Sequence, residues 1–186
     1  MGAYRPYCLV TRGDMSVDET DFESWARTHH QRLLGIARVV TGDPILAQDV
    51  LQDCLLDMFQ RWDRIAGDGA NPLAYAARTM GSKAANHRRT AWGRRVHVTD
   101  EVGLLDANHP DAAGSVENRL LVGMALRQLS PRQRQVVAMH YLLDMTVAEI
   151  AAELQRPPGS ITSDLTRARQ RLRADLSRGG DPSHGR

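Results

Sequence analysis

The chain has 186 residues, which is enough for one domain or two small ones, and its formal net charge of +2 is nearly neutral. Its two cysteines, Cys8 and Cys54, are too few and too far apart for a disulfide framework or a zinc site. No apolar run approaches the roughly 20 residues that span a bilayer, and the first residues lack the basic-then-apolar order of a secretory signal. We therefore expect no membrane insertion and a cytoplasmic location.

The first 20 residues predict a flexible N-terminal arm. Met1 to Glu19 shows no helical periodicity, and a second methionine stands at Met15. Because the segment before Met15 adds nothing to a helical pattern, we expect translation from Met15 to yield an equally active protein.

The first predicted helix runs from Asp21 to about Val40. Its apolar residues recur at the three- and four-residue spacing of a buried face: Phe22, Trp25, Ala26, His29, Leu33, Ile36 and Val40. Thr41 to Pro44 ends it.

A second helix is predicted from Pro44 to about Ile65, with a wide apolar stripe on one side. That stripe contains Ala47, Val50, Leu51, Cys54, Leu55, Met58, Phe59 and Trp62. We expect the Cys54 thiol to be buried and inert. The other side carries Asp49, Gln52, Asp53, Leu56 and Gln60, and residues 43–57 contain aspartates but no lysine or arginine. Such a face is either a docking surface for a basic partner or merely solvated. A metal site is disfavoured, because helical di-metal sites use glutamate with histidine and this helix has no histidine.

A third helix is predicted from Asn71 to about Arg89, with Asn71 as its cap and Pro72 in its first turn. Its core-facing residues are expected to be Leu73, Ala76, Ala77, Met80 and Ala84. The segment 83–95 is basic and has no carboxylate. This composition favours nucleic-acid binding, and a basic surface that serves only solubility is the alternative.

The segment 93–114 loses helical periodicity and becomes acidic. Five carboxylates stand between residues 99 and 117 without one lysine or arginine: Asp100, Glu101, Asp106, Asp111 and Glu117. We interpret it as a flexible linker between two domains.

The last third of the chain predicts a helix-turn-helix. Ser130 with Pro131 caps one helix, and Thr146 with Glu149 forms a capping box for a short helix ending at Leu154. After the turn QRPPG, a final helix places Ile161, Leu165, Ala168 and Leu172 inward. Its outward residues are Thr162, Ser163, Thr166, Arg167, Gln170 and Arg173. An outward polar face of this kind suits the major groove of DNA.

No strand-like alternation of useful length occurs, so the predicted fold is all-α. We expect two small helical domains, residues 21–92 and 115–178, joined by the flexible acidic linker. The C-terminal domain would hold the helix-turn-helix, and residues 179–186 would form a disordered tail.

Three stretches resemble the extracytoplasmic-function group of bacterial sigma-70 factors. The C-terminal stretch reads LSPRQRQVV, TVAEIAAEL and GSITSDLTRARQRLR, the acidic helix reads AQDVLQDCLLDMFQRWDRI, and the basic helix reads NPLAYAARTMGSKAANHRRTAWGRR. The resemblance covers roughly residues 21–92 and 115–177. It implies a factor that binds core RNA polymerase and directs promoter-specific initiation. The acidic helix would bind the beta-prime subunit, and the linker would pass through the polymerase. The expected partners are therefore the beta-prime and beta subunits and promoter DNA.

The resemblance also assigns candidate site residues. Binding to core polymerase falls to Asp49, Gln52, Asp53 and Leu56. Capture and melting of the minus-ten element fall to Tyr75, Arg78, Ser82, Lys83, Asn86, Arg88 and Arg89. Reading of the minus-thirty-five element falls to Ser160, Thr162, Ser163, Thr166 and Arg167. Family members commonly sit in an inhibitory complex with an anti-sigma factor, which is therefore a possible further partner, although nothing in the sequence identifies one.

The chain departs from its relatives at four of the positions near DNA. Relatives often carry asparagine where Ser82 stands and aspartate where Asn86 stands. In the last helix, lysine or arginine is common in place of Thr162, and arginine in place of Asp164. The promoter sequence that this chain prefers therefore cannot be copied from the family.

Nothing in the sequence supports catalysis. It has no glycine-rich phosphate loop, no nucleophile elbow and no metal motif, so we expect no catalytic residue, metal or cofactor. Two other classes of protein remain open. One is a stand-alone helix-turn-helix regulator, which would bind promoter DNA without polymerase. The other is a nucleic-acid enzyme that uses the clustered aspartates with a divalent metal.

Overall fold

A computed structural model describes residues 17–67, 71–92 and 116–179, and within these ranges all regular structure is helical. The predicted all-α class is thus confirmed. The expected linker, residues 180–186 of the expected tail and the arm up to residue 16 fall outside the described residues, whereas Gly179 ends the last helix. Among the helices described, none combines the length and the apolar character needed to cross a bilayer.

The N-terminal half begins with two long helices. α1 spans Val17–Thr41, so it starts four residues before the predicted position and takes in the end of the expected arm. α2 spans Pro44–Phe59 and is capped by Asp43, whose carboxylate accepts from the backbone N–H groups of Ile45 and Leu46. Most of its predicted apolar stripe is buried, with Cys54 and Met58 fully so, whereas Phe59 at its end is 44% exposed.

The second predicted helix was too long by one turn. The chain leaves α2 at Gln60 and starts the short helix α3, Trp62–Ile65, after Arg61 adopts a non-helical conformation (φ −131°, ψ 16°). The break turns the Trp62 ring toward Phe22, at 5.1 Å between ring centroids, and its indole N–H donates to Asp21 at 3.2 Å. Burial of this large aromatic outweighs the loss of continuous helical hydrogen bonds.

The third predicted helix is α4, Pro72–Trp92, and it runs three residues further than expected. The Asn71 side chain accepts from the N–H of Ala74 at 3.1 Å, which confirms the cap. Ala76, Ala77, Met80 and Ala84 are buried as predicted, and Leu73 is half-buried against the same core.

The C-terminal half contains α5 (Val116–Arg127), α6 (Pro131–Leu142), α7 (Val147–Leu154) and α8 (Pro158–Gly179). Both predicted capping boxes are present, Ser130 with Gln133 and Thr146 with Glu149. The predicted helix-turn-helix is α7–α8, and Gln155 ends α7 in the left-handed region (φ 51°).

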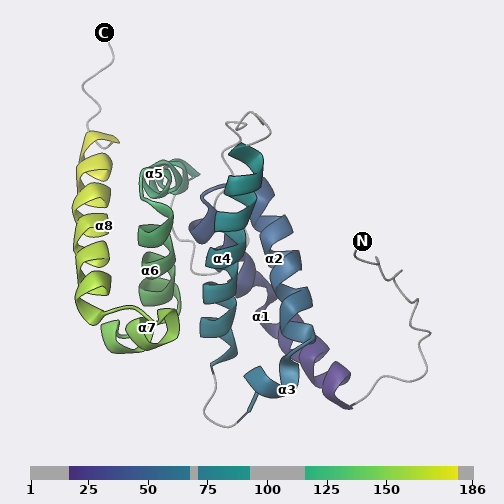
Figure 1. Cartoon of the computed structure of the whole chain (residues 1–186). Helices are drawn as coiled ribbons and strands as arrows, with labels where there is room; N and C mark the ends of the chain where they lie inside the picture. The colour runs from purple at the N-terminus through teal and green to yellow at the C-terminus, as the bar shows by residue number, and fades with distance from the viewer. Residues whose placement is uncertain (1–16, 68–70, 93–115, 180–186) are drawn as a thin grey trace.

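The two halves lie against each other, which the sequence did not predict. Figure 1 shows α6 between α8 on one side and α4 on the other, and α6 contacts both α1 and α4. The buried apolar residues of both halves form one cluster, in which Leu33 and Ile36 join Val136 and Met139. The described helices therefore share a continuous core.

Candidate functional site

The candidate polymerase-binding surface lies on α2. Asp49 and Gln52 are exposed, and the Leu56 side chain, although apolar, is 44% exposed. Beside them is an apolar groove of about 480 Å³ between α1 and α2. Its lining residues are Phe22, His30, Leu34, Gln48, Leu51, Gln52, Leu55, Leu56 and Phe59. An exposed acid and an exposed amide next to an apolar groove suit a partner helix that offers basic and apolar side chains.

Asp53, the fourth candidate on α2, lies on the side of the helix next to α4, and its side chain is 48% exposed. Its carboxylate lies 3.2 Å from Nε2 of His87, and one turn further Asp57 pairs with Lys83 at 3.0 Å. These contacts tie the candidate polymerase-binding helix to the candidate minus-ten helix. Cys54 lies between them, where burial raises the pKa of its thiol to about 12, as expected for an inert cysteine.

Five of the seven minus-ten candidates form one stripe along α4, which we call the minus-ten stripe: Tyr75, Arg78, Ser82, Asn86 and Arg89. Ser82, Asn86 and Arg89 are exposed. The Arg78 guanidinium lies 5.0 Å from the centroid of the Tyr75 ring, and the Asn86 amide accepts from Arg89. The stripe combines cationic, amide and aromatic groups, which can hold phosphates and unstacked bases.

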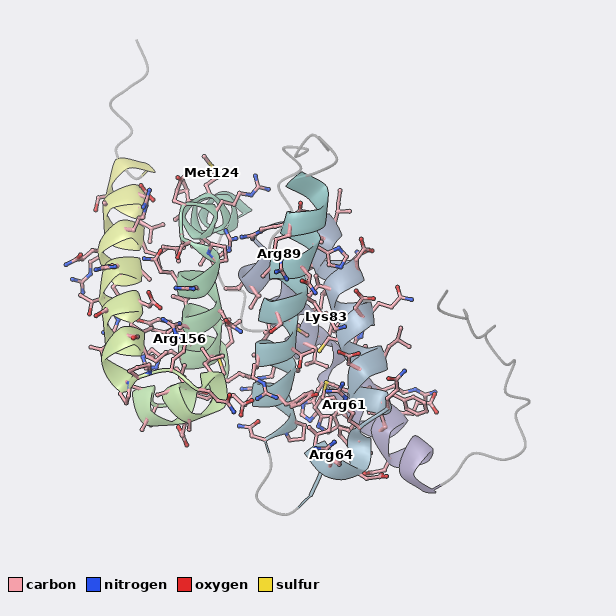
Figure 2. All side chains as sticks on the ribbon, in the orientation of Figure 1. Arg61, Arg64, Lys83, Arg89, Met124 and Arg156 are labelled. Carbon is pink, nitrogen blue, oxygen red and sulfur yellow. The ribbon has the colours of Figure 1, made fainter. Side chains whose placement is uncertain are left out.

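Lys83 and Arg88, the other two minus-ten candidates, do not share this stripe. Lys83 points toward α2 and pairs with Asp57, as Figure 2 shows by its place between the two helices. Arg88 is half-buried and donates to the Thr41 carbonyl oxygen at 2.6 Å, and burial lowers the pKa of its guanidinium. Both cations therefore bind other helices of the chain in this conformation.

The candidate minus-thirty-five surface is the outward face of α8. Thr162, Ser163, Thr166 and Arg167 are exposed, and Ser160 is half-buried at the start of the helix. On the opposite side, Ile161, Leu165 and Ala168 are buried, as the sequence predicted. The buried side fixes the helix on α6, so the polar side faces outward and is free to enter a groove.

Asp164 lies in α8 and faces the connection between α7 and α8 rather than outward. Its carboxylate accepts from Arg156 at 2.6 Å, and the two side chains are only 16% and 25% exposed. Arg156 comes from the connection between α7 and α8 (Figure 2). Asp164 is thus one half of an ion pair that ties α8 to the connection before it.

We expect Asp164→Ala to lower the free energy of unfolding by about 1–2 kcal/mol, because the charged hydrogen bond to Arg156 is lost in a mostly buried setting. Urea unfolding followed by circular dichroism measures it. Ser163→Ala, at the exposed neighbouring position, is the control and should change stability by less than about 0.5 kcal/mol. Equal stability of the two variants would refute the structural role of this pair.

His140 is a packed residue. Its Nδ1 lies 2.8 Å from the Met145 carbonyl oxygen and its Nε2 lies 3.2 Å from the Arg169 guanidinium. Arg169 also donates to the Tyr141 hydroxyl at 2.8 Å. These contacts fasten α8 to the end of α6, so we give His140 a structural role.

Comparison with known proteins decides the family. Residues 21–94 match sigma-70 region 2, and residues 119–172 match sigma-70 region 4. The chain is 36% identical to the RNA polymerase sigma-E factor of Streptomyces avermitilis over 84% of this chain and 85% of that protein. It is 35% identical to the ECF RNA polymerase sigma factor SigL of Mycobacterium tuberculosis, over 74% and 78% of the two chains. The chain belongs to the extracytoplasmic-function group of sigma-70 factors.

The sigma factor also resembles a solved structure. The match is to the sigma factor RpoE of Bartonella quintana in complex with the anti-sigma factor NepR, with 26% identity, a TM-score of 0.67, and coverage of 85% of this chain and 98% of that one. Membership in the family makes the protein a factor for promoter-specific transcription initiation. The alternative of a stand-alone helix-turn-helix regulator is wrong, because such a regulator would leave the region 2 match without explanation.

Proposed function

We propose that this sigma factor uses three surfaces, one to bind core polymerase and one to bind each promoter element. Asp49, Gln52 and Leu56 on α2 bind the beta-prime subunit of core polymerase. Asp53, on the side of α2 that faces α4, contributes to the same contact. The minus-ten stripe captures the melted minus-ten strand. The outward face of α8 reads the minus-thirty-five duplex, with Thr162, Ser163, Thr166 and Arg167 toward the bases and phosphates and Ser160 at the helix start. Residues 21–92 and 115–178 are the two functional halves.

The observation that carries this proposal is the α2 surface. Exposed Asp49, Gln52 and Leu56 lie next to an apolar groove, and exposed apolar surface of this kind marks a binding site for another molecule. A basic, partly apolar helix of another protein would satisfy both features.

The proposal includes three further points. The factor performs no bond chemistry, since each surface binds and none brings a nucleophile beside a base. It acts in the cytoplasm, where core polymerase and the chromosome are. The anti-sigma complex of the Bartonella relative suggests that an anti-sigma factor can hold this chain as well.

The test is in vitro transcription with purified core polymerase on a library of genomic promoter fragments. Adding this protein should produce defined transcripts from a small promoter subset, whereas core alone should produce none from them. Transcripts that do not depend on the protein, or specific promoter binding by the protein without core, would contradict the proposal.

Arg167→Ala should weaken binding of the holoenzyme to promoter DNA at all sequences, because Arg167 is exposed on the outward face of α8. If it neutralises one phosphate, the slope of log affinity against log salt should fall by about 0.9. Binding at several salt concentrations measures this slope. Arg132→Ala, at an exposed arginine on α6, is the control, and an unchanged slope for Arg167→Ala would remove Arg167 from the interface.

A further inference from the structure

The apolar groove between α1 and α2 is not filled by any residue that the structure describes. The two helices lie side by side and run in opposite directions (Figure 1), so Phe22 near the start of α1 meets Phe59 at the end of α2, at 5.5 Å between ring centroids. From this aromatic end the groove runs along α1 as far as Leu34. Leu56 and Phe59 in its lining are each 44% exposed, so apolar surface remains there for another segment to cover.

The sequence before α1 has the composition of a segment that binds apolar surface. Residues 1–16 lie outside the described residues, and within them residues 4–10 read YRPYCLV. Five of these seven side chains are aromatic or apolar when cysteine is included, and they contain two of the four tyrosines of the chain. Segments that stay solvated are poor in such residues, so this composition favours burial against a partner surface.

Charge also favours contact between this segment and α2. Residues 1–13 contain Arg5 and Arg12 and no carboxylate, whereas residues 43–57 contain aspartates and no lysine or arginine. One of these aspartates, Asp49, is exposed beside the groove. Opposite charges at the edge of an apolar contact attract the two surfaces and fix their register.

The length of the segment fits the groove. The groove follows α1 from Phe22 to Leu34, which at about 1.5 Å per residue is about 18 Å. Residues 4–10 can span up to about 23 Å at about 3.3 Å per residue, and residues 11–16 leave about 20 Å for the return from Val17. The segment can therefore lie along the whole groove while it stays joined to α1.

The groove overlaps the proposed polymerase-binding surface. Gln52 and Leu56 line the groove and also belong to that surface. A segment in the groove and a polymerase helix on α2 would therefore exclude each other. Because the segment is tethered, its effective concentration at the groove is on the order of millimolar, so even a weak contact is populated.

We propose that residues 4–10 occupy the α1–α2 groove of the free sigma factor and leave it when core polymerase binds. Occupation of the groove is a property of the chain alone, whereas displacement by polymerase rests on the proposed role of α2. The two parts are therefore tested separately.

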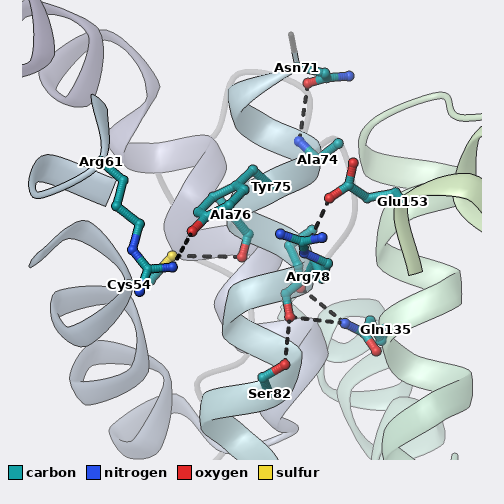
Figure 3. Close-up of polar contacts among 11 residues, drawn as sticks. Cys54, Arg61, Asn71, Ala74, Tyr75, Ala76, Arg78, Ser82, Gln135 and Glu153 are labelled. Atoms are coloured by element: carbon teal, nitrogen blue, oxygen red, sulfur yellow. Dashed lines mark hydrogen bonds and ion pairs between the residues drawn. The ribbon is translucent and has the colours of Figure 1, made fainter. Parts of the chain in front are cut away.

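The first test uses Cys8, which belongs to the segment, as a natural crosslinking group. Cys54 does not interfere, because it is fully buried, its Sγ lies 3.7 Å from the Ala76 carbonyl oxygen (Figure 3), and burial raises the pKa of its thiol to about 12. Gln52→Cys places a second thiol in the groove, and oxidised glutathione is the oxidant. Gln31→Cys is the matched control, because Gln31 is also an exposed glutamine but lies on α1 outside the groove lining.

In the free chain, the Gln52→Cys variant should form an intramolecular disulfide with Cys8 at least about tenfold faster than the control, because docking raises the local concentration of Cys8 at the groove. Mass spectrometry of the digested, non-reduced protein measures both rates. Equal rates would overturn the proposal. Disulfides that join two copies of the chain would also overturn it, because the occupant would then be a second copy.

The second test measures displacement by polymerase. The double variant Leu9→Ser, Val10→Ser makes the segment more polar and should raise the affinity for core polymerase at least about fivefold, which corresponds to a groove that is free in about one fifth of wild-type molecules. Thr11→Ala, one position beyond the segment, is the control and should leave the affinity unchanged. With core in excess, a chain that starts at Met15 should transcribe as well as the full chain, because excess core displaces the segment.

Unchanged core affinity of the Leu9→Ser, Val10→Ser variant would overturn the displacement. In that case the double variant Asp49→Arg, Gln52→Ala identifies which proposal has failed. If it abolishes core binding, the α2 docking surface stands and only the competition with residues 4–10 is wrong. If it binds core normally, the docking surface itself is wrong, and the disulfide test alone decides whether the segment occupies the groove.

Discussion

The double variant Asp49→Arg, Gln52→Ala is expected to weaken the binding of core polymerase at least a hundredfold and to leave the fold intact. Both side chains are exposed on α2, and reversing a charge at a complementary interface converts attraction into repulsion. Exposed substitutions of this kind change stability by no more than about 0.5 kcal/mol. Equilibrium binding of labelled protein to purified core measures the loss, and circular dichroism checks the fold.

Asp63→Arg is the control for this experiment, because Asp63 is also an exposed acid but lies on α3. It should bind core with nearly wild-type affinity. If both variants lose affinity equally, the effect is one of overall charge. If the double variant binds normally, α2 is not the docking surface.

Arg134→Ala is expected to lower the free energy of unfolding by about 2–4 kcal/mol. The substitution leaves the carbonyl oxygens of Val40 and Leu129 without this donor and creates a space in a buried contact. Arg134→Lys should restore only part of the loss, because an ammonium group cannot reach both carbonyls as a guanidinium fork does. Urea unfolding of the full chain measures the difference.

The hydrogen bonds of Arg134 stabilise the fold, whereas burial of its guanidinium charge destabilises it. Burial, and then the nearby Arg88 charge, lower the pKa of Arg134 to about 10, so the charged form is penalised but still predominates at neutral pH. Arg132→Ala provides the comparison on the same helix, since Arg132 is exposed. A loss below about 0.5 kcal/mol for Arg134→Ala would show that the contact contributes little to stability.

Local signals explain why much of this fold was predictable from the sequence. The capping boxes at Ser130 and Thr146 fixed two helix starts, and the spacing of Ile161, Leu165 and Ala168 identified the buried side of α8. These features depend on residues three or four positions apart, which a single sequence displays directly.

The contact between the halves could not be predicted in the same way. Arg134 and Val40 are 94 positions apart, and Arg134 stands in the polar run PRQRQ, which looks like a solvated first turn. Periodicity identifies an apolar face but not the surface that will cover it. Gly81, in the middle of a predicted helix, was the available signal, because a helical glycine often marks a close approach.

The sequence could also not predict which of the minus-ten candidates lie on the same face of α4. The resemblance grouped seven residues, whereas helix geometry separates Lys83 and Arg88 from the minus-ten stripe by turning them toward α2 and α1. The partners of these two cations, Asp57 and the Thr41 carbonyl, come from other helices, so residue spacing within α4 does not indicate them.

The most direct test of the whole account is photocrosslinking from two positions in the assembled holoenzyme on one promoter. A crosslinking residue replaces Thr166 on α8 or Ser82 on α4, both exposed. The account predicts crosslinks from position 166 to the minus-thirty-five duplex and from position 82 to the minus-ten element, in both cases only when core polymerase is present. Crosslinks from both positions to the same element, or equal crosslinking by the protein without core, would contradict it.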